Sequence, residues 1–138
     1  MVTWVQDTPF LPASDDVVRA HEDVLRVDLP RDFLAIAQRR QGASPEPAGV
    51  TLPNGFVTAV DQLLHFEEGF RNIVTRRFPL ETVLDKGVIP FADDIGGGVY
   101  CFSYRDDYDR PPVVFWSVGW GALPLAPSFT AFLDTLHD

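Results

Sequence analysis

The sequence predicts an α+β fold, in which an antiparallel meander of strands is packed against N-terminal and C-terminal helices. Two patterns support this prediction. Apolar residues at helical spacing lie before residue 43 and after residue 127, whereas residues 88–118 hold apolar runs with strand character. The length of 138 residues is close to the commonest size of one domain. We therefore expect a single domain over residues 1–138.

Two helices are expected in the N-terminal part. Ser14 is a suitable N-cap, and Asp15 and Asp16 follow it at the positive end of the helix dipole. The inward face of this first helix is predicted from i, i+4, i+7, i+8 spacing to be Val17, His21, Val24 and Leu25. His21 is then expected to be a partly buried, hydrogen-bonded histidine. A second helix should begin at Leu29-Pro30 and stop near Gly42.

The middle of the chain has weaker signals. Residues 43–55 are rich in Pro and Gly and are expected to form a loop or a pair of turns. Residues 56–66 should contain a short strand, and residues 69–86 one or two helical turns before Pro79.

The second half predicts three sequential strands and a final helix. The first strand, Val88–Ala92, ends in Asp93-Asp94, and a turn at Gly96–Gly98 follows. In the second strand Tyr100, Phe102 and Tyr104 alternate with smaller residues, so they share one face. A polar loop at 105–110 leads to a third strand at 112–118. The last helix should begin near Ser128, with an apolar side formed by Phe129, Phe132, Leu133 and Leu136.

Composition narrows the classes of partner and location. The formal net charge is −9, which on average repels nucleic acid and anionic lipid and attracts a basic partner, although acidity can also serve solubility alone. Cys101 is the only cysteine, and no signal peptide or membrane-length apolar run is visible. We therefore expect a cytoplasmic protein with no nucleic-acid or membrane partner. Its oligomeric state is left open.

The sequence contains no recognisable arrangement of catalytic residues. Gly96–Gly98 lacks the Lys and Ser/Thr of a phosphate loop, and the acidic residues lack calcium-loop spacing. Cys101 lies mid-strand among aromatic residues, where a thiol is usually inert. No nucleophile elbow, HExxH or CxxC is present. The sequence therefore predicts no catalytic residue, no cofactor and no bound metal.

Acidic residues in two connections are the candidate partner-binding residues. Asp93 and Asp94 end one predicted strand, and a second group, formed by Asp106, Asp107, Tyr108 and Asp109, occupies the loop after the next strand. Successive connections of a meander fall at opposite ends of the sheet, so the two groups need not form one patch. Tyr108 favours the second group, because aromatic anchors are enriched at binding hot spots. The alternative is that all five carboxylates are solvated turn residues.

Four segments, in this order, resemble the SUKH superfamily. They are Leu29-Pro30-Arg31-Asp32-Phe33, Ile89 to Gly97 (IPFADDIGG), Pro112 to Trp116 (PVVFW) and Ala126 to Leu133 (APSFTAFL). The family includes bacterial toxin-immunity proteins and a fungal cell-wall regulator. The resemblance implies a non-catalytic protein that binds and neutralises a cognate polymorphic toxin domain, often a nuclease. The alternative is a regulatory scaffold of the same fold.

Overall fold

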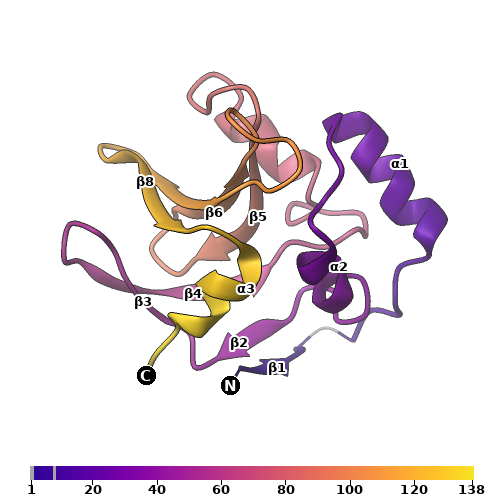
Figure 1. Ribbon diagram of the computed structural model, residues 1–138. Coiled ribbons are helices and arrows are strands. Elements are labelled where there is room, and N and C mark those ends of the chain that lie inside the picture. Colours follow the sequence, from indigo (N-terminus) through magenta and orange to yellow (C-terminus); the bar gives the residue numbers. More distant parts are fainter. Residues whose placement is uncertain (1, 8) are drawn as a thin grey trace.

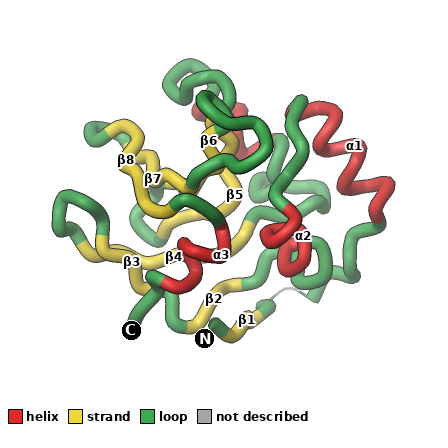
Figure 2. Tube along the Cα trace, viewed as in Figure 1, coloured by secondary structure: helices red, strands yellow, loops and turns green. Residues whose placement is uncertain are grey.

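The structure, a computed structural model, describes residues 2–7 and 9–138. Within these residues the helices are α1 (Asp15–Leu25), α2 (Arg31–Ala37), α3 (Phe129–Asp134) and the 3-10 helix η1 (Thr75–Leu80). The strands are β1 (Thr3–Val5), β2 (Ser44–Glu46), β3 (Gly49–Thr51), β4 (Val57–Leu63), β5 (Val88–Asp94), β6 (Val99–Ser103), β7 (Val113–Ser117) and β8 (Gly121–Ala126). Figure 1 shows a curled sheet with α2 and α3 beside it and α1 at the periphery, and Figure 2 shows the same view by secondary structure.

The main sheet is an antiparallel meander in the order β3-β4-β5-β6-β7-β8. The predicted strands β5, β6 and β7 are confirmed, and so is the strand at residues 56–66, which is β4. β8 was not predicted, because its sequence GALPLA contains a proline and has no strict alternation. The prediction of a loop at residues 43–55 is wrong in part. β2 and β3 lie there as three-residue strands that pair with β1 and β4.

The helix caps predicted from the sequence are confirmed, but the predicted buried face of α1 differs from the one observed. The hydroxyls of Ser14 and Ser128 accept hydrogen bonds from backbone amides of α1 and α3. In α1, however, Val18 is buried, whereas Val24 is 65% exposed. The predicted inward face of α1 is therefore wrong in part: His21 and Leu25 are half-buried, but Val17 and Val24 are exposed. The helix lies at the edge of the molecule, where only a narrow side of it meets other elements (Figure 1).

The core lies on both faces of β5, which is buried along its whole length. On one face the Phe33 ring of α2 packs against Phe91, Phe102 and Phe129, with centroids 5.3–5.6 Å apart. The same cluster holds the predicted row Tyr100, Phe102 and Tyr104. On the other face, Val99 and Cys101 pack with Leu84 and Val88, near Leu80 of η1. The sheet is thus a central layer between α2 and α3 on one side and the η1 region on the other.

We predict that Phe132→Ala lowers the free energy of unfolding by about 3–5 kcal/mol, because it deletes a fully packed ring. Phe132 is 2% exposed and its ring lies 5.4 Å from that of Tyr100. Urea denaturation measures the effect. The control is Phe78→Ala, since Phe78 is 61% exposed and should lose little stability. Equal denaturation midpoints for the wild type and Phe132→Ala would contradict this placement of α3.

Candidate functional site

The loop of residues 105–110, between β6 and β7, is exposed at every position. One carboxylate oxygen of Asp107 accepts hydrogen bonds from the amides of Asp109 and Arg110, both at 2.9 Å. These bonds hold the pKa of Asp107 below its usual value. Tyr108 is 68% exposed, and its ring centroid lies 6.0 Å from that of Tyr104. The loop therefore presents an aromatic side chain on a backbone that its own aspartate holds in a turn.

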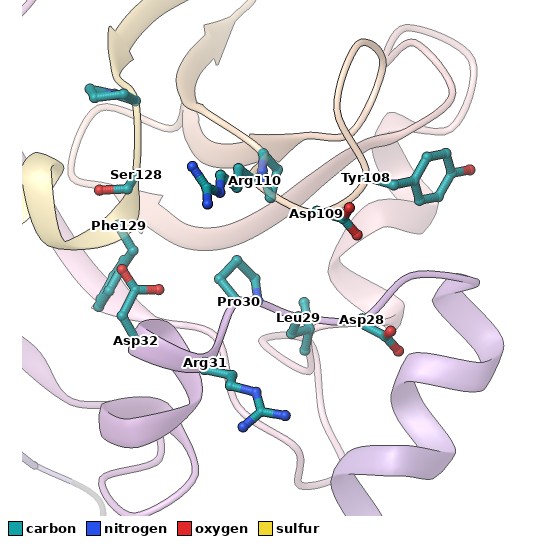
Figure 3. Close-up of a pocket in the computed structure, with 12 residues that line it drawn as sticks. Asp28, Leu29, Pro30, Arg31, Asp32, Tyr108, Asp109, Arg110, Ser128 and Phe129 are labelled. Carbon is teal, nitrogen blue, oxygen red and sulfur yellow. The ribbon is translucent and has the colours of Figure 1, made fainter.

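A groove of about 510 Å³ runs beside this loop. Tyr108 lies at one end of the groove and Ser128 and Phe129 at the other (Figure 3). Its charged lining residues are Asp28, Arg31, Asp32, Asp109 and Arg110. The groove is therefore mixed in charge, with three carboxylates and two guanidinium groups, rather than uniformly acidic.

Three long-range hydrogen bonds assemble the groove. The Tyr104 hydroxyl donates to the carbonyl of Asp28 at 2.8 Å, which fixes the α1–α2 connection beside the loop. The Asp32 carboxylate accepts from the amide and the hydroxyl of Thr130, at 2.9 and 2.8 Å, which ties the start of α2 to α3. Sequence reasoning missed these groove residues as site residues. The signal was present, because Asp28 precedes and Asp32 belongs to the Leu-Pro-x-Asp segment already singled out.

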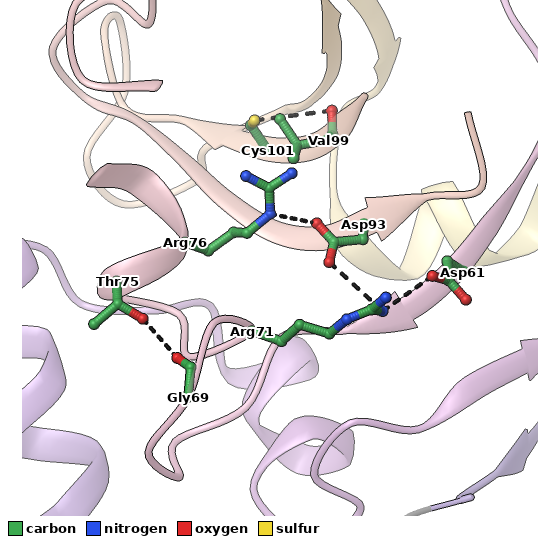
Figure 4. A network of polar contacts seen from close by, with 8 residues as sticks. All are labelled: Asp61, Gly69, Arg71, Thr75, Arg76, Asp93, Val99 and Cys101. Atoms are coloured by element: carbon green, nitrogen blue, oxygen red, sulfur yellow. Dashed lines mark hydrogen bonds and ion pairs between the residues drawn. The ribbon is translucent and has the colours of Figure 1, made fainter. Parts of the chain in front are cut away.

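One interpretation of the sequence was that Asp93 is a solvated turn residue. The structure shows that this interpretation is wrong. Asp93 is 6% exposed, and its carboxylate lies 2.7 Å from Nε of Arg76 and 3.6 Å from a guanidinium nitrogen of Arg71. The two arginines approach different oxygens, and Arg71 also reaches Asp61 at 3.0 Å (Figure 4). Asp93 therefore neutralises arginines beneath the sheet and lies outside the recognition surface proposed below.

Asp94 is also 6% exposed, but it is bonded differently. Its carboxylate accepts hydrogen bonds from the hydroxyls of Thr58 and Tyr100 and from the amide of Gly96. Burial and the hydrogen bond to Asp94 raise the pKa of Tyr100, which keeps its hydroxyl a donor at neutral pH. Asp94 too is removed from the exposed acidic surface. The two neighbouring aspartates and the 106–109 loop do not form one patch.

The cysteine and the histidines, which are the residue types most often reactive, do not form a catalytic cluster. Cys101 is buried between sheet neighbours, and this burial raises the pKa of its thiol well above the usual range. His21 is half-buried as predicted, with its ring nitrogens 2.8 Å from the Val17 carbonyl and 2.9 Å from the Asn72 amide nitrogen. Desolvation lowers the pKa of His65, whose Nδ1 accepts from the amide of Glu67. Among residues 2–7 and 9–138 no cluster of His, Cys, Asp and Glu has the geometry to hold a metal.

None of the helices described between residues 2 and 138 has the length and apolar character needed to cross a membrane.

These features define a class of α+β protein in which short helices pack on a curled meander. An exposed loop lies beside a groove at one end of its sheet. The model of the SMI1 / KNR4 family (SUKH-1) matches residues 12–135, and the chain belongs to this family. The resemblance seen in the sequence is thereby confirmed. Membership is consistent with an immunity-type or related function, and proteins of this family are generally non-catalytic. Comparison with curated proteins gave no match.

We predict that Asp93→Asn lowers the free energy of unfolding by about 3–5 kcal/mol, because it leaves the buried guanidinium of Arg76 without its counter-charge. Urea denaturation measures the loss. Asp85→Asn is the matched control, since it breaks a surface ion pair with Arg105 in which the aspartate side chain is 66% exposed. That pair should contribute about 0–1 kcal/mol. A loss for Asp93→Asn no larger than for Asp85→Asn would show that the buried pair is not stabilising.

Proposed function

We propose that this chain is an immunity protein, which binds a cognate polymorphic toxin domain in the cytoplasm and neutralises it by protein–protein contact. The whole of residues 1–138 acts as one domain and contributes no catalytic group. The observation that carries the proposal is the loop Asp106–Asp109. In a member of the SUKH-1 family, this loop presents exposed carboxylates around Tyr108, beside a groove of about 510 Å³.

The charge of the loop suits a basic partner. Asp106, Asp107 and Asp109 are all exposed, and Arg105 at its start is engaged by Asp85 at 3.0 Å. With a net charge of −9 on the chain, long-range attraction steers a basic surface, such as the substrate groove of a nuclease, toward this protein. The loop therefore acts mainly on the rate of association.

Tyr108 supplies the contact that persists after encounter. An exposed tyrosine can bury a large ring at little cost in conformational entropy, and such residues dominate many interfaces. The mixed charges of the adjacent groove, including Arg31 and Arg110, restrict which partner surface fits. Tyr108 and the groove thus provide affinity and specificity, whereas the carboxylates speed the first encounter with the partner.

We predict that replacing Asp106, Asp107 and Asp109 together by Asn slows association with the cognate toxin about tenfold at low salt and flattens its salt dependence. The Asp107→Asn change keeps a side-chain oxygen that can accept the turn hydrogen bonds, so stability should hardly change. Stopped-flow or surface-based kinetics at two salt concentrations measure the effect. Tyr108→Ala, in contrast, should mainly raise the dissociation rate.

The matched control removes the same number of negative charges from exposed positions elsewhere, as Asp16→Asn, Glu68→Gln and Asp134→Asn. The control variant should keep most of the wild-type salt slope. An association rate and salt slope equal to wild type in the loop variant would exclude this loop. Failure of the chain to rescue cells that express the cognate toxin would instead favour the alternative, a regulatory scaffold of the same fold.

A further inference from the structure

A second hollow lies at the other end of the sheet from the Asp106–Asp109 loop. It has a volume of about 420 Å³ and is lined by residues from the connections β3–β4, β5–β6 and β7–β8. In an antiparallel meander these three connections share one end, whereas the β6–β7 connection lies at the opposite end. We call this hollow the hairpin pocket. Its size falls in the range of about 300–1,000 Å³ typical of binding pockets.

The walls of the hairpin pocket are aromatic. Phe56, beside the β3–β4 turn, and Trp120, in the β7–β8 turn, meet edge to face with ring centroids 5.2 Å apart. The two rings remain 54% and 44% exposed. Phe115 lies behind them, with its centroid 6.4 Å from that of Trp120. These turns belong to strand pairs at opposite edges of the sheet, so the curl of the sheet is what brings the rings together (Figure 1).

The floor of the hairpin pocket is a carboxylate without a counter-charge. Asp94 lines the pocket, and its three donors are all neutral: the Thr58 hydroxyl, which lies within hydrogen-bond distance of both carboxylate oxygens, the Tyr100 hydroxyl and the Gly96 amide. These contacts engage both carboxylate oxygens, but none of them compensates the negative charge of Asp94. Within residues 2–7 and 9–138 no Arg or Lys forms an ion pair with Asp94. Its neighbour Asp93, by contrast, has two.

Glycines keep this floor accessible. Gly96, Gly97 and Gly98 form the turn beside Asp94 and place no side chain in the mouth of the pocket. Gly97 has a φ of +95°, which favours glycine, and a Cβ at Gly98 would lie 2.6 Å from the Phe115 ring. A side chain at either position would therefore strain the turn or displace a wall of the pocket.

We propose that the hairpin pocket binds an arginine side chain presented by a partner protein. The guanidinium group lies against the faces of Trp120 and Phe56, and its positive charge compensates the negative charge of Asp94. An aromatic wall beside an uncompensated buried carboxylate is complementary to a cation that is flat and weakly hydrated. Arginine meets this description better than lysine, whose compact ammonium group is strongly hydrated and does not stack.

This site goes beyond the proposed function, because it lies away from the loop that serves toxin recognition there. The probe that tests it is N-acetyl-arginine amide, titrated into the full-length chain and followed by amide and indole NMR shifts. We expect saturable shifts at Gly96–Gly98 and at the Trp120 indole. The citrulline analogue is nearly isosteric but neutral, and it should bind about tenfold more weakly or worse. Lysine and leucine amides should also bind more weakly.

Matched variants localise the effect. Asp94→Asn removes the charge and keeps an acceptor oxygen, and Trp120→Ala removes an exposed wall; both should abolish the shifts. Asp107→Asn, in the distant loop, should leave them unchanged, so failure here and failure of the toxin proposal are separable. If Asp94→Asn does not fold, the arginine–citrulline comparison on the wild type gives the same answer.

Equal binding of arginine and citrulline, or of arginine and leucine, would overturn the proposal, and so would the absence of shifts at the pocket. A shift at Gly96–Gly98 that depends on protein concentration without probe, and that Trp120→Ala removes, would identify a second copy of the chain as the occupant. It would overturn the inferred partner.

Discussion

The burial of β5 on both faces is the constraint on which the rest of the fold depends. One face of this strand receives the Phe33 ring of α2, and the other supports the region of η1. A strand enclosed in this way cannot leave polar groups unpaired, since a buried carboxylate without partners is costly. Asp93 and Asp94 at its end must therefore be satisfied from within. The alternation of a strand sends them to different partners, two arginines for one and neutral donors for the other.

Much of the architecture was predictable from local patterns. The alternation of Tyr100, Phe102 and Tyr104 and the caps at Ser14 and Ser128 need only neighbouring residues to be recognised, and each is confirmed. β2 has only three residues, too few for a periodic signal, and both β2 and β8 contain proline. Their existence depends on pairing with strands formed elsewhere in the chain.

The candidate sites also combine features that local sequence predicts with features that depend on long-range contacts. Exposure of the 106–109 loop followed from its composition, but the groove beside it requires contacts across large sequence separations, such as Tyr104 with Asp28 and Asp32 with Thr130. The burial of Asp94 likewise depends on Thr58, 36 residues away. No local pattern distinguishes an aspartate that will meet such a partner from one that stays in water. The adjacent pair Asp93-Asp94 therefore looked like the exposed loop residues when only the sequence was considered.

The two outer strands of the sheet bear on how this protein can assemble with others. An incoming strand needs a row of free backbone amides and carbonyls. At β3 the amide and carbonyl of Gly49 already bond to His137, and a side chain at residue 49 would collide with the His137 carbonyl. At the other border, β8 contains Pro124, which has no amide hydrogen to offer. Both borders are thus poor templates for extension by a neighbouring chain, which protects the sheet from edge-to-edge aggregation.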